Sequence, residues 1–233
     1  MEFLKETNLD EIKKIAIKFL NIEPTITIGP FVTHPFFNTI VLFDGNEMFN
    51  IFEDKDKYNN YIRNMENVIL KKQRTQDIIS RIEKPYKMYF LYIIMNYLEQ
   101  HEFSELLIDT WTMIENPCSN SLLTKRDLIK MFKSSCRENM MSKREKQTYD
   151  KFPDEITIYR GVRNKKYKNG LSWTTDKETA IFFATRFSQG TQILYSTTIN
   201  KKDIIVYTNQ RKEREIIINP YTLRKYNIEE VLL

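Results

Sequence analysis

The residue types best suited to chemistry lie near the end of the chain, in Glu213-Arg214-Glu215. The two glutamates occupy alternate positions ahead of the apolar run from Ile216 to Ile218. Because side chains alternate between the faces of a strand, both carboxylates point to one side if the extended geometry reaches back to Glu213. Paired carboxylates serve sugar chemistry: one stabilises an oxocarbenium-like centre and the other activates a nucleophile. The ordinary alternative is the charged rim of a hairpin.

A second candidate is Arg160-Gly161, which follows the expected strand from Ile156 to Tyr159. A guanidinium at the end of a strand, with a glycine beside it, provides a fixed cation with backbone close by. That arrangement suits bidentate binding of a phosphate. The alternative is a surface arginine beside a turn.

A third candidate is Ser172-Trp173-Thr174, in an expected strand from Leu171 to Thr174. Alternation places the Ser172 and Thr174 hydroxyls on one face and Trp173 on the other. Two neighbouring hydroxyls can orient a carboxylate. Local hydrogen bonds at the end of a strand are the alternative.

The order of these three motifs resembles the ADP-ribosyltransferase family of the Arg-Ser-Glu type with a Glu-x-Glu motif. That family includes arginine-specific bacterial toxins and related phage enzymes. The resemblance covers residues 152–233, extends more vaguely to the helices before them, and does not reach the first 80 or so residues. It implies an α+β fold with a mixed, antiparallel-rich β core, and NAD as the substrate that is cleaved.

The resemblance also implies roles for individual residues. Arg160, beside Gly161, matches the arginine that binds phosphate and ribose oxygens of NAD. Ser172 matches the first serine of the family's Ser-Thr-Ser motif, which holds the site near the catalytic glutamate. Trp173 and Thr174 depart from that motif: Thr174 keeps a hydroxyl, and Trp173 leaves the second hydroxyl missing.

In the same comparison, Glu215 matches the catalytic glutamate and Glu213 the upstream glutamate linked to arginine as acceptor. Residues 208–214 look like the acceptor-recognition loop. Downstream of the serine strand, Phe183 and Phe187 are candidates for an aromatic near nicotinamide, and Arg186 for a phosphate contact. Core packing of the aromatics and a helix-dipole role for Arg186 are the alternatives. Three nearby lysines add to the expected phosphate site: Lys165, Lys166 and Lys168.

The periodicity of the chain predicts helices first and then a run of strands with one helix inserted, which is typical of α+β proteins. Expected helices cover 8–20, 57–83, 86–101, 103–115, 124–146 and 176–187. Expected strands cover 25–28, 39–43, 48–52, 156–159, 171–174, 192–199, 204–207, 215–218 and 228–233. The change of pattern at Pro85 predicts an accessory α+β region over 1–84 and a catalytic domain over 85–233.

Composition narrows the function classes. The 233 residues carry a net charge of +5, and the segment 122–168 has 14 Lys and Arg against 6 Asp and Glu. Such a segment can face an anion or be a solvated helical face. Two cysteines outside any CxxC pair and two histidines imply neither a disulfide framework nor a zinc site. A charged N-terminus and no apolar run near 20 residues predict a cytoplasmic protein without membrane spans.

The expected function is therefore a mono-ADP-ribosyltransferase that transfers ADP-ribose from NAD to a macromolecule, with protein arginine favoured over RNA or DNA. A toxin, a phage-encoded host modifier and a defence effector all fit, and an inhibitor or antitoxin protein is a possible partner. Two alternatives stay open: an NAD glycohydrolase, which uses water as acceptor, and a non-catalytic nucleic-acid-binding protein that uses the basic segment and the aromatics.

Overall fold

The computed structural model describes residues 3–114, 122–187 and 190–233, and the chain forms two compact units, Met1–Asp127 and Leu128–Leu233. The boundary expected at 84/85 falls inside the first unit. The reason is packing: the helix that begins beside Pro85 contacts helices on both sides of it in the chain. The change of pattern at Pro85 coincides with the start of this helix.

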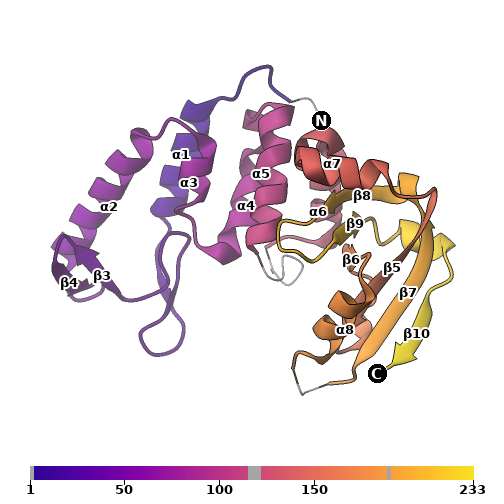
Figure 1. The fold of residues 1–233 in the computed structure, drawn as a ribbon. Helices are drawn as coiled ribbons and strands as arrows, with labels where there is room; N and C mark the ends of the chain where they lie inside the picture. The colour runs from indigo at the N-terminus through magenta and orange to yellow at the C-terminus, as the bar shows by residue number, and fades with distance from the viewer. Residues whose placement is uncertain (1–2, 115–121, 188–189) are drawn as a thin grey trace. The chain divides into compact units, whose positions relative to one another are not determined.

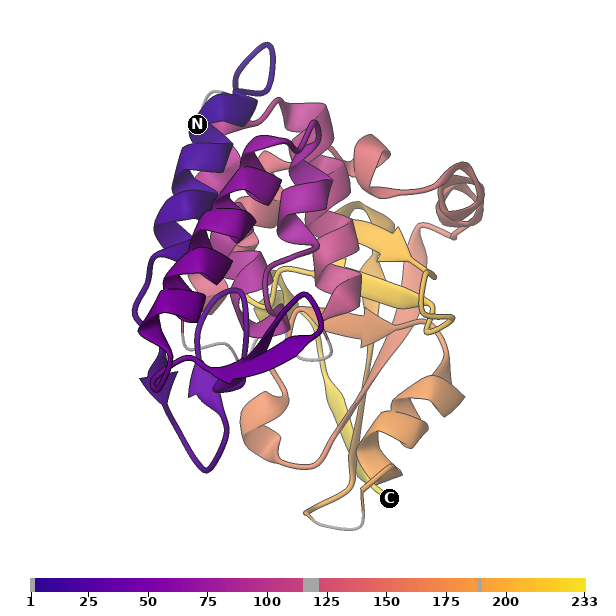
Figure 2. The same cartoon turned by 90° about the vertical axis from the view of Figure 1, so that its left-hand side faces the viewer.

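The helices of the first unit lie side by side (Figures 1 and 2). Asn8 caps the first of them by accepting a hydrogen bond from Glu11 N–H, as the sequence predicts. The expected helix over 57–83 is two helices, with the chain leaving helical geometry after Lys71. The bounds are α1 Leu9–Leu20, α2 Lys55–Leu70, α3 Thr75–Ile79, α4 Lys84–Ile94 and α5 Gln100–Met113.

Helix α4 supplies much of the core of this unit. Its sequence is apolar nearly all round, and Met88, Phe90, Leu91 and Ile94 are fully buried. A helix without a polar face must be enclosed on all sides, so this burial is the result the pattern predicts.

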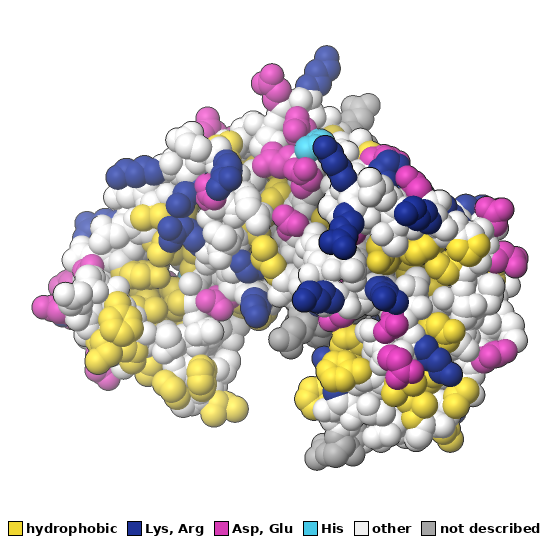
Figure 3. All heavy atoms as spheres, in the orientation of Figure 1, with side chains coloured by type: hydrophobic (Ala, Val, Ile, Leu, Met, Phe, Trp, Pro, Cys, Tyr) yellow, Lys and Arg dark blue, Asp and Glu magenta, His cyan; other side chains and the backbone are white. Residues whose placement is uncertain are grey.

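Two small antiparallel hairpins complete the first unit. They pair β1 Thr25–Ile26 with β2 Val32–Thr33, and β3 Val41–Asp44 with β4 Glu47–Asn50. Strand β2 was not expected from the sequence. Several large apolar side chains on and beside these hairpins are exposed, and Figure 3 shows hydrophobic side chains gathered over the β3–β4 end.

The second unit is built on one antiparallel sheet of six strands in the order β10-β7-β5-β6-β9-β8. The strands are β5 Glu155–Val162, β6 Ser172–Thr174, β7 Ile193–Asn200, β8 Ile204–Thr208, β9 Glu215–Ile218 and β10 Glu229–Leu232. An α+β class with an antiparallel sheet is therefore confirmed.

Helices accompany this sheet. Helix α6 (Lys125–Ser134) crosses the boundary between the units, followed by α7 (Lys143–Asp150) and α8 (Lys177–Thr185). The expected helix over 124–146 is thus interrupted between α6 and α7. Short 3-10 turns lie at Met95–Tyr97, Arg137–Met140, Lys165–Tyr167, Lys201–Asp203 and Thr222–Lys225.

Helix α8 packs closely against β5. A Cβ at Gly161 would lie 1.7 Å from the Ala180 carbonyl oxygen, so only glycine permits this approach. Asp176 caps the helix by accepting from Thr179 N–H at 2.9 Å, as the sequence predicts. Gly161 therefore sets the distance between the Arg160 strand and the helix that follows the Ser172 strand.

Within the described ranges, none of the helices combines the length and the apolar character that a bilayer crossing requires.

Candidate functional site

The three sequence motifs lie on three neighbouring strands. Strands β5, β6 and β9 are adjacent in the sheet, and the register pairs Tyr159 with Thr174 and Thr174 with Glu215. Directly paired residues share a face of the sheet, so these three side chains form one row across it. Residues 56 positions apart in the sequence, Tyr159 and Glu215, are thereby brought to the same row.

Thr174 connects the second motif to the third. Its Oγ1 donates to the Glu213 carbonyl oxygen at 2.7 Å and accepts from Asp176 N–H at 3.0 Å. Next to it, Thr175 N–H donates to the Arg214 carbonyl oxygen at 3.1 Å. Thr174, the third residue of Ser-Trp-Thr, therefore fixes the backbone segment that carries the two glutamates. It does so through its side-chain hydroxyl.

Trp173 plays a different part from its neighbours. Its side chain is buried on the opposite face of β6, and its Nε1–H donates to the Gly170 carbonyl oxygen at 3.2 Å. The ring is thus part of the core. Any contact of Trp173 with a ligand would have to involve its backbone rather than its side chain.

The two carboxylates of Glu-x-Glu converge on one guanidinium. Arg211 Nη2 lies 3.0 Å from Glu213 Oε2 and 3.2 Å from Glu215 Oε2. The Glu215 side chain is 4% exposed, and that of Glu213 is 26% exposed. Both carboxylates therefore reach the same point, with Glu215 deeper and Glu213 nearer to solvent.

Burial raises the pKa of Glu213 above its ordinary value, and the negative charge of Glu215 adds to the rise. The positive charges of Arg211 and Arg186 oppose it. A carboxylate whose pKa is raised is a better proton acceptor near neutral pH than an ordinary glutamate.

The backbone of the loop between β8 and β9 determines how the side chains of Arg211 and Glu213 are oriented. Lys212 and Arg214 both adopt positive φ values, 60° and 47°, which non-glycine residues rarely do. Each such residue costs on the order of 1–3 kcal/mol and persists only where its surroundings hold it. Asn209 supplies part of that support: its Oδ1 accepts from Arg214 N–H at 3.0 Å, and its carbonyl accepts from Lys212 N–H at 2.9 Å.

Glu145, which the sequence reasoning did not single out, anchors the start of this loop. One carboxylate oxygen completes the capping box of α7 with Ser142. The other accepts from Thr208 Oγ1 at 2.9 Å and from Asn209 N–H at 2.6 Å. Burial raises the pKa of Glu145, but these hydrogen bonds outweigh it and leave the pKa below the ordinary value. The Ser-x-x-Glu spacing was visible in the sequence; its second set of partners was not.

Arg160 contacts the Ser172 strand through the backbone. Its Nη1 donates to the Ser172 carbonyl oxygen and its Nε donates to the Tyr167 carbonyl oxygen at 3.0 Å. The guanidinium lies over Gly170, where an added Cβ would come within 2.2 Å of Arg160 Nη2. Arg160 therefore lies beside Ser172 and contacts its carbonyl oxygen, not its hydroxyl.

Aromatic and basic side chains gather at the end of α8. The Arg186 guanidinium lies 4.7 Å from the Phe183 ring centre and 5.0 Å from that of Phe187. The Arg163 guanidinium lies 4.5 Å from the Phe187 ring centre. Phe187 and Arg186 are exposed and Phe183 is half-buried, so this cluster is a surface feature rather than core. Stacked guanidinium and aromatic groups can contact both a planar ring and a phosphate.

Among the three lysines expected near a phosphate, Lys165 pairs with Glu230 at 2.6 Å. The Lys166 ammonium lies over Tyr167, and that of Lys168 lies over Tyr195. The Lys165 ammonium is thus paired with a carboxylate of β10. Across the described residues, His, Cys, Asp and Glu side chains do not gather in threes where they could hold a metal ion.

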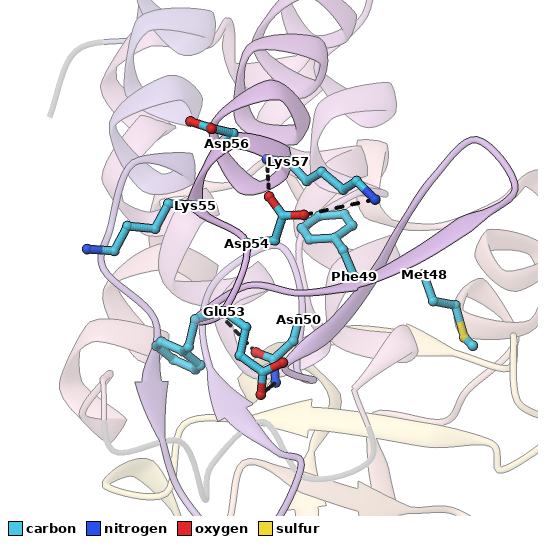
Figure 4. A pocket seen from close by; sticks show the side chains of 9 residues that line it. Met48, Phe49, Asn50, Glu53, Asp54, Lys55, Asp56 and Lys57 are labelled. Carbon is cyan, nitrogen blue, oxygen red and sulfur yellow. Dashed lines mark hydrogen bonds and ion pairs between the residues drawn. The ribbon is translucent and has the colours of Figure 1, made fainter.

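A hollow of about 680 Å³ lies in the first unit, beside the start of α2 (Figure 4). Its wall includes Asp54, whose carboxylate caps α2 by accepting from Lys57 N–H at 3.0 Å and pairs with Lys57 Nζ at 3.9 Å. All of its lining residues fall between Met48 and Lys57. It therefore contains none of the residues predicted from the three motifs.

The chain matches no family model, no curated protein and no solved structure.

Proposed function

We propose that the second unit is a mono-ADP-ribosyltransferase that cleaves NAD and transfers ADP-ribose to a macromolecular acceptor, with a protein arginine favoured over RNA or DNA. One observation carries the proposal: the Glu213 and Glu215 carboxylates converge on a single guanidinium, and Glu215 lies in the row that Tyr159, Thr174 and Glu215 form across β5, β6 and β9. A charged hairpin rim would leave both glutamates in solvent, whereas Glu215 is almost fully buried.

Glu215 fits the role of the catalytic carboxylate. A buried carboxylate can accept a hydrogen bond from the ribose 2′-hydroxyl and stabilise positive charge as the bond to nicotinamide breaks. Thr174 supports this role through its paired position in the register and its bond to the Glu213 carbonyl. Ser172, two positions earlier on the same face of β6, is the second hydroxyl available to the row.

Glu213 fits the role of the group that faces the acceptor. It is more exposed than Glu215, and its raised pKa suits the removal of a proton from an incoming nucleophile. A carboxylate that already holds a guanidinium can hold another, which favours arginine. The same arrangement allows water to take the acceptor's place, so NAD hydrolysis is the outcome expected when no acceptor is present.

Arg160 and the α8 cluster fit the binding of NAD itself. The Arg160 guanidinium is fixed in place by two carbonyls and supplies a positive charge beside Ser172. Phe183 and Arg186 offer a ring face and a second cation. We propose that these groups hold the phosphates and the nicotinamide end of the substrate, with no metal ion required.

The test is release of nicotinamide from NAD by the purified protein, compared with Glu215→Gln. Loss of a group that stabilises charge in the transition state lowers turnover by about 10²–10³-fold. Glu178→Gln, an exposed carboxylate in the first turn of α8, is the matched control and keeps full turnover. Circular dichroism and thermal unfolding of each variant check that the fold is intact.

Equal nicotinamide release by the wild type and Glu215→Gln would contradict the assignment, as would no release by the wild type. Incubation of a cell lysate with labelled NAD, followed by separate protease and nuclease digestion, then identifies the class of acceptor. Label that is lost with protease supports a protein acceptor, and label that is lost with nuclease supports RNA or DNA.

A further inference from the structure

The guanidinium between the two glutamates belongs to the chain itself. Arg211 lies in the loop between β8 and β9, two residues before Glu213 and four before Glu215. Its Nη2 contacts both carboxylates, and its side chain is 28% exposed. An internal residue thus occupies the position that the proposed function gives to an external acceptor.

The loop geometry holds Arg211 in this position. Residues flanking Glu213 on both sides have positive φ, and Asn209 bonds across the loop to Arg214. Arg214 by contrast turns away: its Nη1 lies 3.5 Å from Asp176 Oδ1, and its side chain is 61% exposed. Of the two arginines in this loop, Arg211 therefore contacts the glutamates and Arg214 points away from them.

We propose that Arg211 is a self-modification site, and that the protein transfers ADP-ribose from NAD to this arginine within the same molecule. The inference rests on the proposed function of the second unit. It goes further in naming a particular nitrogen-bearing group as acceptor and in making the reaction intramolecular.

The reaction balances with NAD as the only co-reactant. An Nη nitrogen of Arg211 forms a bond to C1′ of the nicotinamide ribose, and the bond from C1′ to the nicotinamide nitrogen breaks. The electron pair of the broken bond leaves with nicotinamide, which becomes neutral. The proton lost from the guanidinium passes to the Glu213 carboxylate, and no oxidant or reductant is needed.

The position of Arg211 supports this step in two ways. Its nitrogen is already within hydrogen-bond distance of the carboxylate that would remove its proton, so the reacting groups need little reorganisation. A ribose hydroxyl that binds Glu215 competes with its contact to Arg211, while the Glu213 carboxylate lies 3.0 Å from the same nitrogen. Burial raises the pKa of Glu213, which favours acceptance of the proton.

The experiment incubates the purified full-length protein with labelled NAD and no added acceptor. The product is digested with a protease that does not cleave at arginine, and the labelled residue is identified by mass spectrometry. The variants are Arg211→Lys, which removes the guanidinium and keeps a positive charge, and Arg214→Lys, the matched control in the same loop. Free nicotinamide and transfer to agmatine, a small guanidino compound, are measured in parallel.

The expected result is label on Arg211 that forms at a rate per molecule independent of protein concentration. Arg211→Lys loses the loop label, and its transfer to agmatine rises because an internal competitor is gone. Arg214→Lys keeps the label of the wild type.

Two outcomes overturn the proposal in different ways. A wild type that releases nicotinamide and modifies agmatine but leaves Arg211 unlabelled, or whose labelling rate rises with protein concentration, refutes self-modification and leaves the proposed function standing. A wild type that releases no nicotinamide under any condition refutes the proposed function, and self-modification with it.

Discussion

The two units both contain short strands, β1 to β4 in the first and β6, β8 and β9 in the second. The two groups of strands differ in which side chains they bury. The hairpins of the first unit leave large apolar side chains in solvent, Met48 and Phe43 among them. The strands of the second unit bury polar ones: Thr174, Thr208 and Glu215. A burial pattern, more than strand length or sheet size, separates the two regions.

Burying a polar group costs free energy unless it finds a hydrogen-bond partner. Four buried polar residues of the second unit, Glu145, Thr174, Thr208 and Glu215, have partners that form one connected set around the loop of residues 208–214. A fifth, Thr197, donates instead to the Asn227 carbonyl oxygen. Exposed apolar side chains impose no such requirement. We therefore expect substitutions in this connected set to have larger effects than substitutions at the exposed apolar side chains.

Among the buried polar groups, the largest stability effect is expected at Glu145. Glu145→Ala removes the acceptor for Thr208 and Asn209 as well as half of the α7 capping box, which costs about 3 kcal/mol since a hydrogen bond to a charged group contributes about 1.5–3 kcal/mol. Chemical denaturation measures it.

The same residue gives a pH test. The pKa of Glu145 is lowered in the folded protein, so its stabilisation is complete above the ordinary glutamate pKa of about 4.3 and is lost as pH falls through the folded value. Glu138→Ala, an exposed glutamate whose partner is Lys146, is the matched control and changes stability by less than about 0.5 kcal/mol. Equal losses from the two substitutions would remove the distinction between buried and exposed polar groups.

Arg160→Lys keeps the positive charge and loses the planar guanidinium. We expect NAD affinity to fall by about 1.5–3 kcal/mol, the range of a charge-assisted hydrogen bond. Isothermal titration with NAD measures the affinity, and Arg144→Lys is the control because Arg144 is exposed on α7 and belongs to none of the three motifs. Unchanged affinity in Arg160→Lys would return Arg160 to a structural role, in which it only ties Tyr167 and Ser172 together.

Glu213 is expected to separate transfer from hydrolysis. Transfer to agmatine needs the ionised carboxylate, and burial raises the pKa of Glu213, so transfer falls on acidification at a pH above that expected for an ordinary glutamate. Glu213→Gln lowers transfer more than NAD hydrolysis and removes this pH dependence. Parallel assays of the two activities from neutral to acidic pH check the prediction; equal loss of both would make Glu213 part of the NAD pocket.

The smallest effect is expected at the exposed apolar side chains of the first unit. Met48 in β4 is 67% exposed, and Met48→Ser changes the free energy of unfolding by less than about 0.5 kcal/mol. Its neighbour Phe49 is 6% exposed, and Phe49→Ala costs about 3–5 kcal/mol. Neither change alters turnover of NAD per folded molecule. A large loss of turnover in Met48→Ser would connect the first unit to the chemistry.

Local signals in the sequence predicted much of the secondary structure. Asn8 and Asp176 cap the helices expected of them, and the strand from Glu215 to Ile218 has the expected bounds. The break between α2 and α3 and the strand β2 were not predicted. Helix α3 packs against α1, a contact between distant residues that a helical pattern in a short window does not record. Strand β2 has two residues and pairs with β1 a few positions earlier, so it is too short to show an alternating pattern.

The candidate site divides in the same way. The sequence alone identified four candidate residues, because each motif is contiguous in the chain: Arg160, Ser172, Glu213 and Glu215. The occupant of the glutamate pair, Arg211, was not predicted, since the positive φ of Lys212 and Arg214 turns the loop back on itself. Glu145 was hidden for a different reason: its partners lie 63 and 64 residues away.

The Glu145 bridge has a consequence for where this unit can be cut. All three motifs fall after Phe152, and a minimal fragment chosen from them would start there. Such a fragment would lack α7 and leave Thr208 Oγ1 and Asn209 N–H without their carboxylate, at the base of the loop that carries Arg211 and Glu213. A fragment that keeps the hydrogen bonds of Glu145 to this loop therefore has to include α7 and begin before Ser142.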